Sequence, residues 1–278
     1  MKIVNGYSLM EFAKKHRYIL PAFNTTNLEM TIGIANGFAK AGLPGYIQVS
    51  SSNLKLSDPH IMVEITKHAL AYADVPVALH LDHGKSFEDV KACVNAGFTS
   101  VMIDASHLPF EDNIREVKQA VEYCHFYGVP VEAELGALGG KEDDIANEAE
   151  STTDPSMVRE FASRCGCDLL AVSVGNVHGL DLQPRVDLKL LKEIAEVSPV
   201  PLVMHGGSGI PFDIIRKAKA FNLLKINYGA DLRKAFIETF GKAYAQNANA
   251  HDVISLSKLA VENVSNKARD LVSIINSN

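Results

Sequence analysis

The chain has few cysteines, no long apolar run and no excess of basic residues. Four cysteines in 278 residues are too few for a disulfide framework. No apolar stretch is long enough to span a bilayer, and the sequence shows no signal-peptide pattern at its start. A net charge of −6 without a basic run argues against nucleic acid or an anionic membrane as a partner. We therefore expect reduced thiols and a cytoplasmic location.

One cysteine pair has a spacing that suggests a metal or redox site. Cys165 and Cys167 are separated by one glycine, but no second pair accompanies them and Cys167 lies next to an apolar run. We therefore interpret the cysteines as free thiols packed near a core. The chain has the material for a large core, because 47% of its residues are hydrophobic.

Short apolar runs, often β-branched, recur along the chain and predict buried strands. They cover residues 18–23, 45–49, 75–80, 100–103, 129–134, 169–174, 200–204 and 223–226. Between most of them lie stretches with helical spacing, which open with N-cap signals such as Asp58-Pro59 and Asp154-Pro155. The alternation predicts repeated strand-then-helix units.

Such units in one uninterrupted chain predict an α/β fold, a single-domain TIM (β/α)8 barrel over residues 1–278. An open doubly wound sheet is the competing architecture, but the Gly-x-Gly-x-x-Gly pattern expected after its first strand is absent. Residues 136–153 are rich in Gly, Asp and Glu, which is typical of a functional loop. Residues 252–275 predict one amphipathic helix, which packs either on a neighbouring subunit or on its own barrel.

Polar side chains follow the predicted strands, where a barrel of this kind carries its catalytic groups. In chain order these strand ends hold Asn24, Ser50, Asp82, His83, Asp104, Glu134, His178, His205 and Asn227. Three of them are histidines near glycine, and three imidazoles leave an open tetrahedral position on zinc. The sequence therefore predicts a metal-dependent enzyme with His83, His178 and His205 as ligands. Five other histidines are interpreted as ordinary surface or core residues: His16, His60, His68, His125 and His251.

Carboxylates accompany the predicted ligands. Asp82 directly precedes His83 and is placed as a general acid/base, with orientation of a ligand or helix capping as its alternative roles. Asp104 and Glu134 would bind a second or displaced metal, or accept hydrogen bonds from imidazole. Glu132 shares a strand face with Glu134, and buried charge there indicates a functional site because it is costly without partners.

Glycine-rich segments end the last two predicted strands. Gly206-Gly207-Ser208-Gly209 follows one, and Asn227-Tyr228-Gly229 ends the other. Glycine lets backbone N–H groups approach an anion, and these two strands host phosphate sites in many barrels. Ordinary turns are the alternative, but the location favours a phosphate site.

Taken together, these strings resemble the class II, zinc-dependent ketose-bisphosphate aldolases, which include fructose- and tagatose-bisphosphate aldolases. The matching strings run through most of the chain in the family's order. They are PAFN (21–24), LDHG (81–84), MIDASH (102–107), VEAELG (131–136), GGKEDD (139–144), LAVSVGNVHG (170–179) and HGGSG (205–209).

The resemblance implies a lyase that cleaves a ketose 1,6-bisphosphate reversibly into dihydroxyacetone phosphate and an aldehyde. Zinc, held by the three histidines, would polarise the donor ketone, and Asp104 and Glu134 would form an alternative metal position with His83. Glu142 would take the carbon-bound proton, and Asp82 would move the proton of the aldehyde-derived hydroxyl.

The resemblance also implies how the donor is held and what accompanies it. The donor contacts would be Asn24, Ser50, Gly179, Gly206, Ser208, Asn227 and Asp231. A monovalent cation, Na+ or K+, would often be bound at the phosphate. The implied partners are a sugar phosphate and further copies of the chain, in a homodimer or homotetramer.

The sequence departs from the family pattern at the phosphate site. After His178-Gly179 the family has Tyr-Lys-Gly, whose lysine meets the donor phosphate, but residues 180–183 here read Leu-Asp-Leu-Gln. After Asn227 the family carries a threonine hydroxyl that this chain lacks. The altered positions are Leu182, Gly229 and Ala230. Arg185 is a candidate to replace the lysine, and Arg269 is a candidate for the far phosphate.

These departures leave three alternatives open. The donor is unphosphorylated or differently substituted, or the chain is a non-catalytic accessory subunit of a related aldolase. A metal-dependent hydrolase would also fit three histidines, since it needs a metal-activated water. Asp82, Glu142 and the histidines argue against the accessory subunit, which has no need of them.

Overall fold

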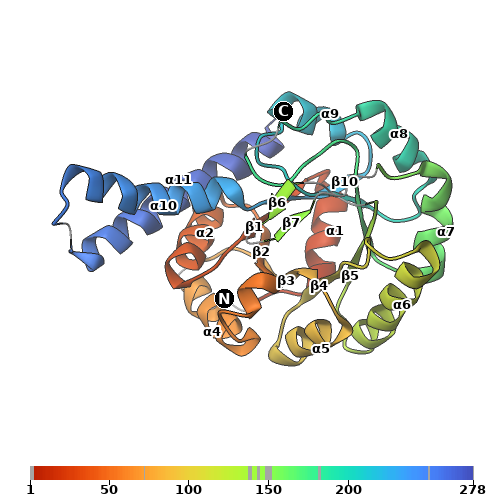
Figure 1. The fold of residues 1–278 in the computed structure, drawn as a ribbon, viewed down its shortest axis with the longest axis horizontal. Helices are drawn as coiled ribbons and strands as arrows, with labels where there is room; N and C mark the ends of the chain where they lie inside the picture. Colours follow the sequence, from red (N-terminus) through yellow and green to blue (C-terminus); the bar gives the residue numbers. More distant parts are fainter. Residues whose placement is uncertain are drawn as a thin grey trace.

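The computed structural model describes residues 3–71, 73–136, 140–142, 145–147, 152–180, 183–249 and 251–277, with the backbone alone for 140–142 and 145–147. Within these ranges, eight parallel strands close into a barrel (Figure 1). The predicted TIM barrel is therefore confirmed. In order around the barrel, the strands are β1 (Leu20–Asn24), β10 (Leu223–Tyr228), β9 (Leu202–Met204), β8 (Leu169–Val172), β5 (Val131–Leu135), β4 (Ser100–Ile103), β3 (Val77–Gly84) and β2 (Gly45–Ser50).

Helices surround the barrel and connect its strands (Figure 1). They are α2 (Leu28–Ala41), α3 (Ser51–Leu54), α4 (Pro59–Leu70), α5 (Phe87–Ala96), α6 (Phe110–Phe126), α7 (Pro155–Cys165), α8 (Leu188–Val197) and α9 (Phe212–Ala218), and α10 (Ala230–Gln246) follows the last strand. The predicted N-cap residues directly precede α4 and α7. Asp58 accepts a hydrogen bond from the His60 N–H, and Asp154 accepts one from the Ser156 N–H.

The barrel interior changes from apolar at its N-terminal end to polar at its C-terminal end. At the N-terminal end, α1 (Gly6–His16) packs Leu9 and Met10 against inward side chains such as Tyr46 and Ala78. Two residues further along their strands, the inward positions are Gln48 and His80, both fully buried. Since side chains alternate along a strand, these polar positions form one layer above the apolar one. The fold thus presents buried polar groups at the C-terminal mouth.

Within the polar segment after β5, the described residues form a β-hairpin, which its composition does not indicate. β6 (Gly140–Glu142) pairs antiparallel with β7 (Ile145–Asn147), with Gly140 opposite Asn147 (Figure 1).

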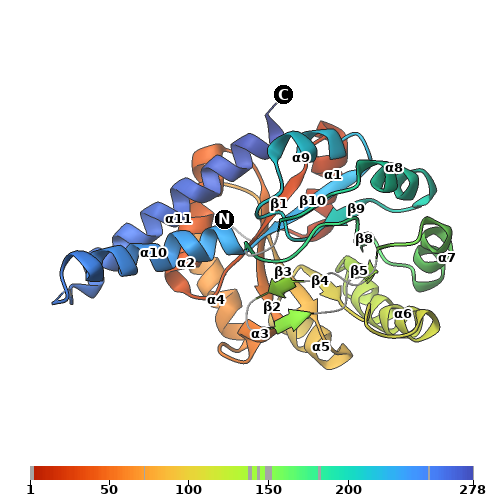
Figure 2. The ribbon, with the colours of Figure 1, turned by 45° about the horizontal axis from the view of Figure 1, so that its top comes forward.

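α10 and α11 (Val253–Asn276) form an antiparallel pair that projects from one side of the barrel (Figures 1 and 2). The second half of α11 packs on α2 of its own barrel. The approach is close because Gly37 has no side chain, and a Cβ there would lie 2.5 Å from the Cβ of Ala268. Further out on the pair, the exposed apolar side chains are Ile237, Tyr244, Val253, Ile254 and Leu259.

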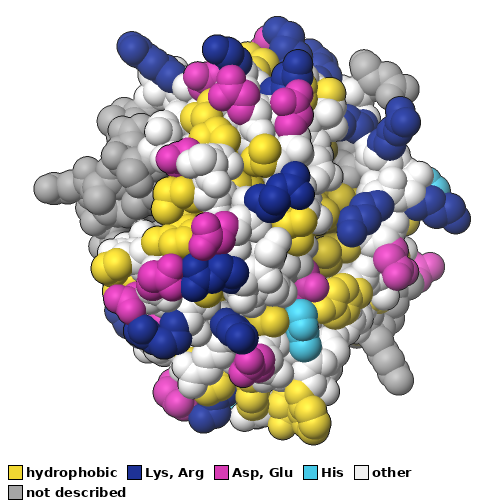
Figure 3. All heavy atoms as spheres, turned by 90° about the vertical axis from the view of Figure 1, so that its right-hand side faces the viewer, with side chains coloured by type: hydrophobic (Ala, Val, Ile, Leu, Met, Phe, Trp, Pro, Cys, Tyr) yellow, Lys and Arg dark blue, Asp and Glu magenta, His cyan; other side chains and the backbone are white. Residues whose placement is uncertain are grey.

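The surface carries both signs of charge. On the side away from the projecting helices, basic and acidic side chains are interspersed (Figure 3). Arg164 of α7, for example, pairs with Glu111 at 2.6 Å and with Glu160 at 2.8 Å. Among the described helices, none has the length and apolar character needed to cross a bilayer. The four cysteines are free and buried, as the composition predicts.

Candidate metal centre

Three imidazoles from distant parts of the sequence meet at the C-terminal mouth of the barrel. His83 lies at the end of β3, His178 follows β8, and His205 directly follows β9. One ligand nitrogen from each lies within 4.8 Å of the others. Nitrogens that share a tetrahedral zinc at ~2.1 Å are about 3.4 Å apart, so small side-chain movements bring these three into one coordination sphere.

The end of β3 is distorted in a way that serves this site. Asp82 and His83 are adjacent, and a regular strand would point them to opposite faces. Both are nevertheless buried, at 0% and 7% exposure. His83 has a positive φ of 49°, and the register with β4 shifts between Leu81 and Gly84. A left-handed non-glycine residue costs roughly 1–3 kcal/mol, and such strain collects at functional sites.

Two carboxylates extend the cluster on one side of His83. Asp104 Oδ2 lies 2.9 Å from His83 Nδ1 and 2.7 Å from Lys85 Nζ, while Glu134 Oε2 lies 3.9 Å from the same imidazole nitrogen. Burial opposes ionisation of Asp104, but the hydrogen bond and charge of His83 and Lys85 hold its pKa well below the usual value. His83, Asp104 and Glu134 form a second group of ligand atoms within 4.8 Å. Two metal positions would therefore share His83.

A second observation, the lack of hydrogen-bond partners for two buried atoms, also indicates that these side chains fit a metal ion. His205 Nδ1 and Glu134 Oε2 are buried 3.4 Å apart, and neither makes a hydrogen bond within the part of the chain that the structure describes. A buried polar atom without a partner costs about 1–3 kcal/mol. Nitrogen and carboxylate ligands are those that zinc prefers, so an ion bound here would satisfy these atoms.

The other ring nitrogen of His205 is fixed by a buried ion-pair network. His205 Nε2 lies 2.8 Å from Glu132 Oε1, and Lys225 Nζ donates to Glu132 Oε2 at 2.9 Å. All three side chains have no exposure. Burial alone would raise the pKa of Glu132, but Lys225 and His205 bring it far below its usual value. The carboxylate therefore orients the imidazole with Nδ1 toward the centre.

Asp82 is held as an anion by amide donors. Asn24 Nδ2 donates to Oδ2 at 2.7 Å, Gln48 Nε2 donates to the same oxygen at 3.1 Å, and Asn227 Nδ2 donates to Oδ1 at 3.0 Å. Burial opposes ionisation, but His83 and other nearby cations bring the pKa of Asp82 below its usual value. A buried, oriented carboxylate beside the histidine cluster can take a proton from a bound hydroxyl.

Two of the proposed ligands, His178 and His205, have pKa values shifted in opposite directions in the metal-free protein. Burial, together with His83 and His205, lowers the pKa of His178 to about 3, so this imidazole is neutral. Burial also disfavours the charged form of His205, but its hydrogen bond to Glu132 and the nearby carboxylate of Glu134 raise the pKa of His205 to about 9. A metal must displace this proton, because only neutral imidazole binds.

Zinc affinity will therefore rise with pH up to about pH 9, by roughly tenfold per unit, and then level off. Zinc titration against a competing chelator between pH 6.5 and 8.5 measures the slope, and calorimetry in two buffers counts the protons released. The variant His60→Ala, which removes an exposed histidine of α4, should leave the slope unchanged. Affinity that does not vary with pH would show that His205 is neutral or is not a ligand.

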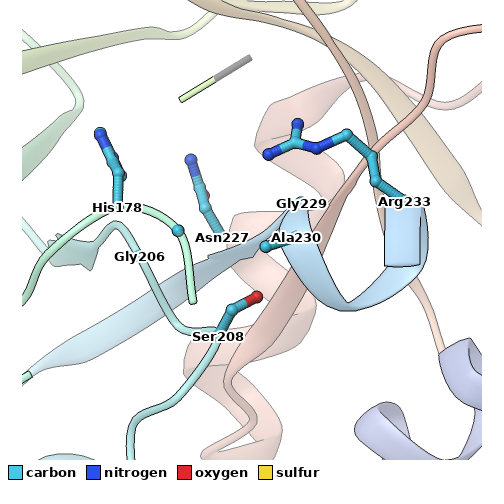
Figure 4. A pocket seen from close by; sticks show the side chains of 8 residues that line it. His178, Gly206, Ser208, Asn227, Gly229, Ala230 and Arg233 are labelled. Atoms are coloured by element: carbon cyan, nitrogen blue, oxygen red, sulfur yellow. The ribbon is translucent and has the colours of Figure 1, made fainter. Parts of the chain in front are cut away.

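A small pocket adjoins the histidines, on the side of the last two strands (Figure 4). Its lining residues are His178, Gly179, Gly206, Ser208, Asn227, Gly229, Ala230 and Arg233. Gly206 has a φ of 63°, and a Cβ there would collide with the Val177 carbonyl oxygen. α10 begins at Ala230, so its N-terminal N–H groups lie at the pocket. This is an arrangement that binds anions.

The remaining predicted residues have mixed placements. Asn24 contacts Asp82, as above, and Ser50 is buried and accepts a hydrogen bond from the Asn53 N–H at the start of α3. Asp231 does not line the pocket. Its N–H donates to Ser208 Oγ at 3.3 Å, and its carboxylate lies 3.9 Å from Lys267 Nζ.

Two sequence predictions fall outside what the structure describes. Glu142 belongs to β6 by its backbone, but its side chain, and hence its predicted role, lies outside the described part of the chain. Leu182 is likewise outside the described residues. Of the two candidate phosphate cations, Arg185 is exposed and does not line the pocket, and Arg269 donates to Asp270 at 2.7 Å.

Sequence reasoning missed three residues of the site: Gln48, Lys225 and Arg233. A signal existed for the first two, since each is a polar residue within an apolar run, at an even spacing from a strand-end residue. Lys225 precedes Asn227 by two positions and so shares its face. Arg233 gave no such signal, because an arginine in the first turns of a helix is ordinarily exposed.

Comparison with known proteins finds aldolases both among sequence relatives and among solved structures. The family model for class II fructose-bisphosphate aldolase matches residues 4–278. A fructose-bisphosphate aldolase of Geobacillus stearothermophilus is 39% identical over 256 residues, covering 91% of this chain and 89% of that protein. The crystal structure of the YdjI aldolase from Escherichia coli K12 superposes with a TM-score of 0.86 at 30% identity, covering 99% and 98% of the two chains. A fructose-bisphosphate aldolase of Campylobacter jejuni, at 22% identity, TM-score 0.82 and coverage of 99% and 96%, shares the fold.

Proposed function

Because this chain belongs to the class II fructose-bisphosphate aldolase family, we propose that it is a zinc-dependent aldolase that reversibly cleaves a ketose phosphate. The default substrate is a ketose 1,6-bisphosphate, which gives dihydroxyacetone phosphate and an aldehyde, and residues 1–278 act as a single domain. The observation that carries this proposal is the meeting of three histidines beside a buried, amide-bound Asp82 at the barrel mouth.

His83, His178 and His205 would hold the zinc, with Asp104 and Glu134 as an alternative position around His83. A bound zinc would supply Lewis-acid polarisation of the donor's ketone oxygen. Glu142 is the base proposed to remove the carbon-bound proton of the donor. This assignment is supported by the chain order, since the segment of Glu142 follows β5, which carries Glu134 of the cluster.

Asp82 acts on the other half of the substrate. In cleavage, its carboxylate takes the proton of the hydroxyl that becomes the aldehyde oxygen, and in synthesis it returns that proton. Amide groups of Asn24, Gln48 and Asn227 bind both carboxylate oxygens and keep them oriented. Asn24, Asn227 and Ser50 would also contact the donor, and the pocket around Gly179, Gly206 and Ser208 would hold its phosphate, with Na+ or K+ bound there.

The test is a retro-aldol panel with the zinc-loaded protein. Fructose and tagatose 1,6-bisphosphates, their 1-phosphates and the free ketoses are each assayed with and without a chelator. We expect cleavage of a bisphosphate, loss of that cleavage with the chelator and its recovery when zinc is added back. Mg2+ in place of zinc serves as the metal control, since it prefers oxygen ligands.

Other outcomes redirect the proposal. Cleavage of the free ketoses alone would mean that the donor is unphosphorylated. No cleavage of any panel member by zinc-loaded protein would contradict the default substrates, and would favour either a different donor or an accessory subunit of a related aldolase.

We also propose that the arm formed by α10 and α11 joins copies of this chain into a homodimer or homotetramer. Its exposed apolar residues include Ile254 (70% exposed) and Tyr244 (63%). Exposed apolar side chains gathered on one element are typical of a protein–protein interface. The variant that combines Ile254→Asp with Tyr244→Asp should raise the dissociation constant by roughly a hundredfold, measured by sedimentation.

A matched change on the barrel is the control for this experiment. Phe126 is 83% exposed on α6, away from the arm, so Phe126→Asp should leave the sedimentation unchanged. A wild-type protein that sediments as a monomer at all concentrations would contradict the proposed assembly.

A further inference from the structure

The pocket beside the histidines is lined by a positively charged side chain, Arg233, which the sequence pattern did not indicate. Arg233 lies in the first turns of α10, yet its guanidinium turns back toward the pocket instead of extending along the helix surface (Figure 4). Among the described residues that line the pocket, it is the side chain with a permanent charge. The pocket therefore has a positive group on the face opposite the glycine-rich segment around Ser208.

The backbone at Gly229 makes room for this guanidinium. A Cβ built at Gly229 would lie 3.0 Å from Arg233 Nη1 and 3.1 Å from Nη2. It would also lie 3.1 Å from Asn24 Oδ1. Any side chain at position 229 would thus press on the guanidinium from one side and on the amide network of Asp82 from the other. Glycine at 229 and arginine at 233 form a spatial pair.

We propose that Arg233 is the residue that binds the phosphate of the donor in this chain, and that Gly229 allows it to reach that group. The inference rests on the proposed function, since it concerns the donor of the same reaction. It assigns a phosphorylated donor, because a guanidinium in a small polar pocket recognises a dianionic phosphate far better than a neutral hydroxymethyl group.

Three kinds of donor would then meet the phosphate together. The guanidinium offers two parallel N–H groups, the first turn of α10 offers backbone N–H groups, and Ser208 offers a hydroxyl. The chain lacks a threonine hydroxyl at Ala230 and a lysine after Gly179, and one arginine supplies both a charge and directed hydrogen bonds. The altered positions are therefore a coordinated change rather than a loss of the site.

The test uses the donor half-reaction, which needs no knowledge of the aldehyde. Zinc-loaded full-length protein is incubated with dihydroxyacetone phosphate in D2O, and NMR follows exchange of the carbon-bound proton. For Arg233→Ala we expect the KM for exchange to rise by roughly ten- to a hundredfold, with kcat changed by less than about threefold. Arg233→Lys should recover part of the loss, and Gly229→Ala should raise KM in the same direction.

Binding of inorganic phosphate gives a readout that is independent of catalysis. Millimolar phosphate should raise the melting temperature of the wild-type protein and have little effect on Arg233→Ala. Zinc content and circular dichroism establish that each variant is folded and loaded. The matched control is Arg185→Ala, which removes an exposed arginine that does not line the pocket and should leave KM unchanged.

The outcomes separate this inference from the proposed function. If the wild type exchanges the proton and Arg233→Ala does so with the same KM and the same phosphate stabilisation, the role of Arg233 is wrong while the aldolase proposal stands. If the effect appears in Arg185→Ala instead, the cation has been misassigned. If the wild type exchanges no proton but loses its phosphate stabilisation with Arg233→Ala, the donor proposal fails and the anion site remains.

Discussion

Replacing His205 with alanine will abolish stoichiometric zinc binding and lower retro-aldol turnover by roughly a thousandfold or more. The imidazole supplies one of three proposed ligands, and the loss of several kcal/mol of Lewis-acid stabilisation corresponds to at least about three powers of ten in rate. Metal analysis of the desalted protein and turnover at a saturating substrate concentration measure the two effects. The variant His178→Ala should show the same losses of zinc binding and turnover, although this side chain is only half-buried.

Because His205 is fully buried, its loss can also disturb folding, and the experiment must separate the two effects. The less buried His178→Ala variant serves this purpose, with circular dichroism and thermal melting measured on both variants. His60→Ala changes an exposed histidine on α4 and should retain metal and turnover. A folded His205→Ala protein that keeps one zinc per chain would contradict the proposed ligand set and would favour the His83, Asp104 and Glu134 position.

The barrel could be predicted from the sequence because its strands are buried on both faces. Residues such as Ile47 and Val49 face the helices while Tyr46 faces the barrel interior, so β2 reads as a mainly apolar run, interrupted by Gln48, that differs clearly from its neighbours. The N-cap residues Asp58 and Asp154 also made the first residues of two helices predictable. The β6–β7 hairpin could not be predicted, since its strands are only three residues each and carry no apolar pattern.

The location of the candidate site could be predicted for a topological reason. All strands of a parallel barrel end at the same mouth, so residues that follow different strands must lie close together whatever their separation in sequence. This rule brings His83 to His205 without any knowledge of the connecting helices. It does not predict that Asp82 and His83 both face inward, which depends on the positive φ of His83 and the register shift in β3.

The rule also fails for side chains that reach the site from elsewhere. Lys225 lies within a strand rather than at its end, and its contact with Glu132 spans 93 positions of sequence. Arg233 reaches the pocket from the helix that follows the barrel, and a Cβ at Gly229 would crowd its guanidinium at 3.0 Å. Such long-range steric conditions are not visible in a local pattern.

Replacing Asp82 with alanine will separate the two halves of the reaction. Cleavage and synthesis of the carbon–carbon bond should fall by roughly a hundred- to ten-thousandfold, the usual contribution of a general acid or base. Exchange of the donor's carbon-bound proton should stay within about tenfold of the wild type, because Glu142 rather than Asp82 is proposed to move that proton. Retro-aldol assays and deuterium exchange into dihydroxyacetone phosphate, on the same zinc-loaded preparation, measure the two rates.

The ratio of these rates is more informative than either alone, because a general loss of structure lowers both. Asp82→Asn keeps the shape of the side chain but removes the charge, so it should reproduce the alanine variant's loss of cleavage. The control Asp213→Asn alters an exposed carboxylate of α9 that pairs with Lys217, and it should change neither rate. Equal loss of exchange and cleavage in Asp82→Ala would mean that this carboxylate acts by holding His83 or the donor. Another group would then have to transfer the proton to and from the aldehyde oxygen.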